Sequence, residues 1–115
     1  MSLIEALEKV GFLSDKRLEY YYQEKLHQEV GGQREVVLPN RKRIDLLTKT
    51  ELIEVKHAKK WSSAIHQLLA YSAYYPNKQK RLHLFGLSSV KDPRAVFDAA
   101  RKECDAHAIK LTWEA

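Results

Sequence analysis

The chain has 115 residues, of which 44% are hydrophobic and 30% are charged, and its formal net charge is +5. This size and balance predict one globular domain over residues 1–115 and exclude a disordered chain. The single cysteine excludes internal disulfides and cysteine-based zinc or iron–sulfur sites, and no apolar run is long enough to span a bilayer. With an acidic, amphipathic N-terminal segment instead of a signal peptide, the sequence predicts a cytoplasmic protein, in a prokaryotic, phage or plasmid context.

Helix and strand signals alternate along the chain. The predicted elements are helices over 2–10 and 14–30, strands over 33–39, 41–47 and 51–56, a helix over 61–75, a strand over 81–87, a helix over 92–105 and a strand over 108–113. A capping-box pattern beginning at Ser2 starts the first helix, and Ser14 or Asp15 caps the second. Pro76 stops the helix before it. The order ααβββαβαβ predicts an α/β fold with a mixed sheet flanked by helices.

Positive charge is concentrated in the middle of the chain. Residues 33–81 contain eleven Lys and Arg against four Asp and Glu, a net charge of +7, whereas residues 1–32 carry −2 and residues 82–115 are neutral. A local basic field favours a polyanion such as nucleic acid. A basic surface that only keeps the protein in solution is the competing interpretation.

Two acids interrupt the hairpin predicted for residues 41–56. If the chain turns at residues 49–50, Asp45 lies directly opposite Glu54, with Cβ atoms about 4.5–5.5 Å apart. Side chains two residues apart on a strand share a face, so Lys56 joins the two carboxylates. The hairpin therefore gathers two acids and an amine on one side.

Opposed like charges destabilise a sheet unless something compensates them. A divalent cation such as Mg²⁺ would do so, because it takes carboxylate oxygens as ligands and keeps waters for a substrate. Such an ion lowers the pKa of its water and stabilises charge on a phosphoryl group, and Lys56 beside it could orient that water. The alternative is that Asp45 only pairs with Arg43 or Lys56 on a solvated face.

The acid at Asp45 and the run Glu54-Val55-Lys56 resemble the motif of the PD-(D/E)XK nuclease superfamily, although Ile44 stands where that motif usually has Pro. The following helix contains Gln67-Leu68-Leu69-Ala70-Tyr71, which resembles the QxxxY motif of RecB-type nucleases. The resemblance implies a restriction-endonuclease-like core over about residues 15–90, with the helix and strand of residues 92–113 added to it.

The resemblance also implies a chemistry, namely a Mg²⁺-dependent endodeoxyribonuclease in which Mn²⁺ can substitute. The residues that it assigns to the catalytic site are Asp45, Glu54, Lys56 and Gln67, with Asp45 and Glu54 as metal ligands. Members of the superfamily often carry a further acid on the preceding helix. Glu19 fits the spacing of that acid as a third metal ligand, and Glu24 is the alternative.

DNA is the expected partner, with RNA left open. The expected nucleic-acid contacts are Arg41, Lys42, Arg43, Lys59, Lys60 and Tyr71. The small size leaves little room for a recognition domain, which favours a homodimer and structure-selective or restriction-type cleavage. A nucleic-acid-binding module without catalysis is the first alternative, and a domain that binds an acidic protein is the second.

Overall fold

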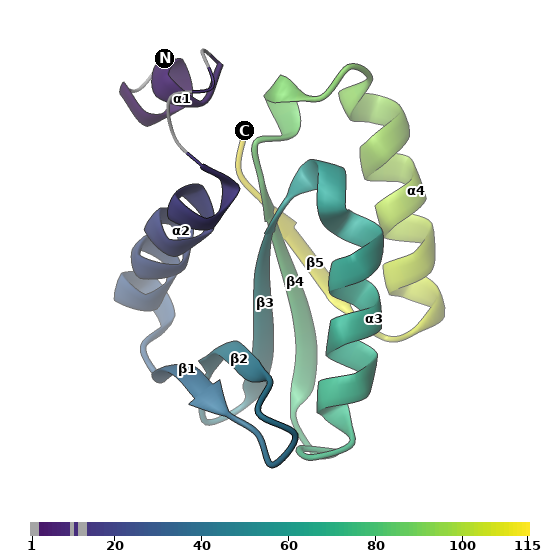
Figure 1. Cartoon of the computed structure of the whole chain (residues 1–115). Coiled ribbons are helices and arrows are strands. Elements are labelled where there is room, and N and C mark those ends of the chain that lie inside the picture. The colour runs from purple at the N-terminus through teal and green to yellow at the C-terminus, as the bar shows by residue number, and fades with distance from the viewer. Residues whose placement is uncertain (1–2, 10, 12–13) are drawn as a thin grey trace.

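The computed structural model describes residues 3–9, 11 and 14–115 (Figure 1). Its elements are α1 (Leu3–Lys9), α2 (Asp15–Val30), β1 (Gln33–Val37), β2 (Arg43–Leu47), β3 (Glu51–His57), α3 (Trp61–Ser72), β4 (Gln79–Phe85), α4 (Pro93–Ala106) and β5 (Lys110–Trp113), with short 3₁₀ turns η1 (Ala58–Lys60) and η2 (Leu87–Ser89). The predicted order of helices and strands is confirmed, whereas the two 3₁₀ turns were not predicted.

The five strands form one mixed sheet in the order β1-β2-β3-β4-β5. The first three strands are an antiparallel meander, and β3, β4 and β5 are parallel neighbours joined through α3 and α4. In Figure 1, α2 covers one face of the sheet while α3 and α4 cover the other. The predicted α/β class, with a mixed sheet between helices, is confirmed.

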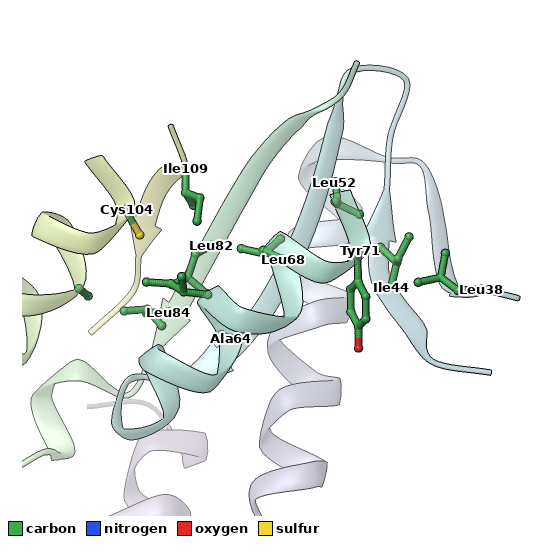
Figure 2. Close-up of a cluster of buried hydrophobic side chains, with 12 residues drawn as sticks. Leu38, Ile44, Leu52, Ala64, Leu68, Tyr71, Leu82, Leu84, Cys104 and Ile109 are labelled. Atoms are coloured by element: carbon green, nitrogen blue, oxygen red, sulfur yellow. The ribbon is translucent and has the colours of Figure 1, made fainter. Parts of the chain in front are cut away.

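Each face of the sheet has its own apolar core. On the α2 face, Leu18, Tyr22 and Leu26 recur at spacings of four and pack on residues of β2, β3 and β4. The ring of Tyr22 stacks on Phe85 with centroids 4.3 Å apart. On the opposite face, α3 and α4 pack on a larger cluster (Figure 2). Strand β3 contributes side chains to both cores, because Leu52 packs in one and Ile53 in the other.

Local chemistry explains where several elements begin and end. Ser14 is the N-cap of α2, since its Oγ accepts a hydrogen bond from the Arg17 N–H at 3.3 Å, while Ser2 lies outside the described residues. Helix α3 ends at Ser72, three residues before the predicted end at Tyr75. The residue before a proline is disfavoured in a helix, and the chain closes with a turn before Pro76 instead. Among the described residues, no helix is long and apolar enough to cross a membrane.

Candidate functional site

The β2–β3 register is the one predicted from the sequence. Leu46 pairs with Ile53, so the same register carried one residue further puts Asp45 opposite Glu54. The regular backbone pairing stops at this point. The two acids therefore lie where β2 begins to separate from β3.

The two carboxylates take over hydrogen bonds that a regular ladder would give to backbone carbonyls. The Asp45 N–H donates to Oε1 of Glu54 at 3.3 Å, and the Val55 N–H donates to Oδ2 of Asp45 at 2.8 Å. Each strand thus supplies a carboxylate that binds the backbone of the other. This exchange holds both acidic side chains in the gap between the strands.

Strand β1 is irregular at the same level of the sheet. Arg34 pairs with Leu46 and Val36 pairs with Ile44, so Glu35 stands opposite Asp45. Glu35 has a φ of 51°, in the left-handed region that residues with a Cβ rarely adopt. The charge of Glu35 contributes to a raised pKa at Asp45. We did not single out Glu35 from the sequence, and counting outward from the Pro-Asn turn at 39–40 would have paired Asp45 with Arg34, one residue away from the observed register.

Burial controls the protonation of the acidic pair. It raises the pKa of Asp45 to about 6, and the Val55 N–H and the Lys56 charge only partly oppose it. Glu54 is 2% exposed, and burial followed by the charge of Asp45 raises its pKa well above the usual value. Burial therefore disfavours the ionised form of both carboxylates in the folded protein.

Lys56 lies close enough to both carboxylates for its charge to lower their pKa values. Its Nζ is also 3.6 Å from Oε2 of Glu19 on α2. The structure thus brings Asp45, Glu54 and Lys56 together and places Glu19 against the lysine. The alternative acid, Glu24, pairs instead with Arg34 of β1. Within residues 3–9, 11 and 14–115, no three His, Cys, Asp or Glu form a group that could hold a metal ion.

The predicted residues on α3 have different environments. Oε1 of Gln67 is buried and has no hydrogen-bond partner in the part of the chain that the structure describes. Tyr71 was expected on a nucleic-acid surface, but it is 6% exposed and packs in the core (Figure 2). Burial raises the pKa of Tyr71, and the charges of Glu54 and Asp45 raise it further. Tyr71 is therefore a packing residue of the core, close enough to the acidic pair to feel its charge.

The predicted basic contacts fall into two groups. Arg41, Lys42 and Arg43 are exposed around the β1–β2 turn. Lys59 and Lys60, just before α3, share one carboxylate oxygen of Asp15 at 3.1 and 3.3 Å. The charge at the β1–β2 turn is the more available for a polyanion, because the second group is partly neutralised.

The donor set of this site fits a hard cation. Mg²⁺ is commonly held by one or two carboxylates with several waters, and Asp45 and Glu54 supply two carboxylates from adjacent strands. Burial disfavours the ionised forms of both carboxylates, and a bound cation would offset part of that cost.

Comparisons with known proteins give relatives in one virus. No family model matches the chain, and no solved structure matches it. The KilA-N domain-containing protein L33 of Acanthamoeba polyphaga mimivirus is 42% identical over 89 residues, which cover 77% of this chain and 34% of that protein. Protein L32 of the same virus, also named for a KilA-N domain, is 37% identical over 83 residues, 72% of this chain and 22% of its own. This chain thus spans about a third or less of these relatives. Their names do not locate the KilA-N domain within the aligned segment.

Proposed function

We propose that this domain is a metal-dependent nuclease that hydrolyses DNA phosphodiester bonds on a restriction-endonuclease-like core. The observation that carries the proposal is the pair Asp45 and Glu54, held in the gap between two strands with Lys56 beside them. A buried like-charge pair is a costly arrangement, and perturbed carboxyl groups of this kind cluster at functional sites.

In the proposed mechanism, Asp45 and Glu54 would hold a Mg²⁺ or Mn²⁺ ion through their carboxylate oxygens. When bound, such an ion supplies a polarised phosphoryl oxygen and an acidified water. Lys56 donates a hydrogen bond to the attacking water or to the developing phosphate charge. Glu19, 3.6 Å from the Lys56 ammonium, holds it in position.

Support for a nucleic-acid substrate comes from charge. Residues 33–81 carry +7, and the exposed basic cluster at the β1–β2 turn belongs to this segment. Such side chains bind phosphates and position a duplex without reading its sequence. We therefore propose DNA as the substrate, with RNA as a second substrate to assay.

Cleavage assays test the proposal. Plasmid, linear and branched DNA and single-stranded RNA are incubated with Mg²⁺ or Mn²⁺ and the wild type, Asp45→Asn or Lys56→Met. We expect both variants to cut at least about 100-fold more slowly, because each removes a group that stabilises transition-state charge. Lys102→Met, on the exposed surface of α4, is the matched control and should cut like the wild type. If no substrate is cut, or if both site variants cut at the wild-type rate, the proposal fails.

A nucleic-acid-binding module without catalysis is the second candidate. The observation that favours it is the engagement of Lys56 by Glu19, since the described residues form no group of three His, Cys, Asp or Glu that could hold a metal ion. Calorimetry separates the two functions: this candidate requires salt-dependent DNA binding without Mn²⁺ binding. Loss of DNA binding at about 50 mM salt would favour the protein-binding alternative.

We also propose a homodimer acting in a cytoplasmic compartment. Two copies related by a twofold axis would present two sites, as cleavage of both strands of a duplex requires. Sedimentation velocity at several protein concentrations tests the dimer, and a single monomeric species at every concentration would exclude it.

A further inference from the structure

The outer side of α2 carries an exposed tyrosine ring that is in cation–π contact with an arginine. Tyr20 is 56% exposed, and the guanidinium carbon of Arg34 lies 4.4 Å from the centroid of its ring. Arg34 is fixed in turn, because its Nε donates to Oε1 of Gln23 at 2.9 Å and its Nη1 pairs with Glu24. The guanidinium therefore orients the Tyr20 ring while leaving most of its side chain in solvent.

Beside this ring lies an open hollow of about 520 Å³, lined by Tyr20, Ser14, Lys16 and Arg17. The two cations are exposed, and neither forms an ion pair with another described residue. Asp15, the acid nearest to them in the sequence, is already neutralised by Lys59 and Lys60. The hollow therefore combines an aromatic ring with positive charge that is free to bind an anion.

We propose that this hollow is a binding subsite for an unpaired nucleotide, whose base stacks on Tyr20 while its phosphates meet Lys16 and Arg17. Aromatic platforms combined with cations bind single strands in a sequence-tolerant way, since every base has a π-face. A base within a duplex has both faces covered by its neighbours. The subsite thus selects single-stranded over double-stranded nucleic acid.

The residue before Tyr20 on α2 belongs to the candidate catalytic centre. This residue, Glu19, lies 3.6 Å from the ammonium of Lys56. Consecutive helical residues point in different directions, so on this proposal a strand held on Tyr20 would pass around α2 to reach the centre beside Lys56. This part of the inference rests on the proposed function, and it names the substrate class as DNA with a single-stranded segment, such as a flap or a frayed end.

Fluorescence anisotropy in EDTA tests the subsite without cleavage. A labelled oligothymidylate and a labelled duplex of equal length are titrated with the wild type, Tyr20→Ala, Tyr20→Phe and Tyr74→Ala. Tyr74, 43% exposed near the end of α3, is the matched control. We expect Tyr20→Ala to bind the single strand about tenfold more weakly with duplex binding unchanged. Tyr20→Phe and Tyr74→Ala should stay within about twofold of the wild type, because the first keeps the ring and the second removes one elsewhere.

A salt titration adds a second readout. The double variant Lys16→Gln/Arg17→Gln should lower the slope of log K against log salt by about 0.7 for each phosphate that it no longer neutralises. Four outcomes would each overturn the inference. Tyr20→Ala could bind the single strand as tightly as the wild type, or lose single-strand and duplex affinity equally. The salt slope of the double variant could be unchanged, or the wild type could fail to bind at about 50 mM salt. If the single-strand affinity depends on Tyr20 but the protein cuts no substrate, the nuclease proposal is wrong and the proposed subsite is still supported.

Discussion

At the scale of single residues, the burial of the acidic pair Asp45 and Glu54 lowers the stability of the folded protein. Burial raises the pKa values of both Asp45 and Glu54, so folding opposes their ionisation. A fold selected for stability alone would put an apolar or neutral side chain in this gap. This cost is the reason for which we propose that the pair serves to bind a ligand.

The pH dependence of stability measures this cost. The pKa of Asp45 is about 6 in the folded protein and 3.8 in the unfolded chain. The folded state thus binds more protons over this interval, and the contribution of Asp45 to the free energy of unfolding falls as pH rises from about 4 through 6. We expect Asp45→Asn to lose this decline and to be about 1–2 kcal/mol more stable than the wild type at pH 8, measured by urea unfolding.

The comparison has to be made between variants at each pH. His83, whose pKa is lowered by burial, contributes a slope of the opposite sign that is common to both proteins. Asp98→Asn, at an exposed acid of α4, is the control and should change stability by less than about 0.5 kcal/mol. A constant difference between wild type and Asp45→Asn from pH 4 to pH 8 would contradict the assignment of a raised pKa to Asp45.

The site residues were predictable to different degrees. Asp45, Glu54 and Lys56 follow from counting outward from one turn, because a strand repeats every two residues. Glu19 was expected as a third metal ligand, and in the structure its carboxylate lies 3.6 Å from the Lys56 ammonium, a placement that depends on how α2 crosses the sheet. Its role as a metal ligand stays a prediction.

At the scale of elements, the junction between α2 and β1 sets the position of the hairpin. Gly31 and Gly32 both have positive φ, of 71° and 87°. A Cβ on Gly31 would meet nothing within 4 Å, whereas a Cβ on Gly32 would lie 2.6 Å from the Leu47 carbonyl oxygen. The chain can therefore pass this closely over the end of β2 only with glycine at position 32.

These neighbouring glycines provide a matched pair of substitutions. Gly31→Ala should destabilise the fold by about 1–3 kcal/mol through backbone strain alone. Gly32→Ala adds a clash with backbone that cannot move aside, so we expect it to cost at least about 1 kcal/mol more. Thermal and urea unfolding of the two variants, side by side, measure the difference. Equal stability of the two variants would show that β2 yields to the added methyl group.

At the scale of the whole molecule, the site lies where an antiparallel meander meets a parallel sheet. Strand β3 belongs to both, since it pairs with β2 on one side and with β4 on the other. Its apolar side chains enter the two cores, which keeps β3 rigid while β2 separates from it at Asp45. A rigid strand beside a gap is a suitable frame for a bound ion.

Metal binding should therefore appear as global stabilisation. A ligand that binds only the folded state raises its stability with concentration, by about 2.7 kcal/mol at 100 times its Kd. We expect Mn²⁺ to raise the Tm of the wild type and of Asp98→Asn, and to leave that of Asp45→Asn nearly unchanged. The measurement is differential scanning fluorimetry with Mn²⁺ against an equal concentration of Na⁺. An equal rise in Asp45→Asn would place the ion elsewhere.

The sequence by itself determined the order of the elements, the β2–β3 register and the grouping of Asp45, Glu54 and Lys56. These features follow from local periods, caps and turns, which act over a few residues. Only the tertiary structure decided that Tyr71 is core and that Tyr20 is exposed under Arg34. Such outcomes depend on how a helix is rotated against the sheet, which is set by the packing of residues distant in the chain.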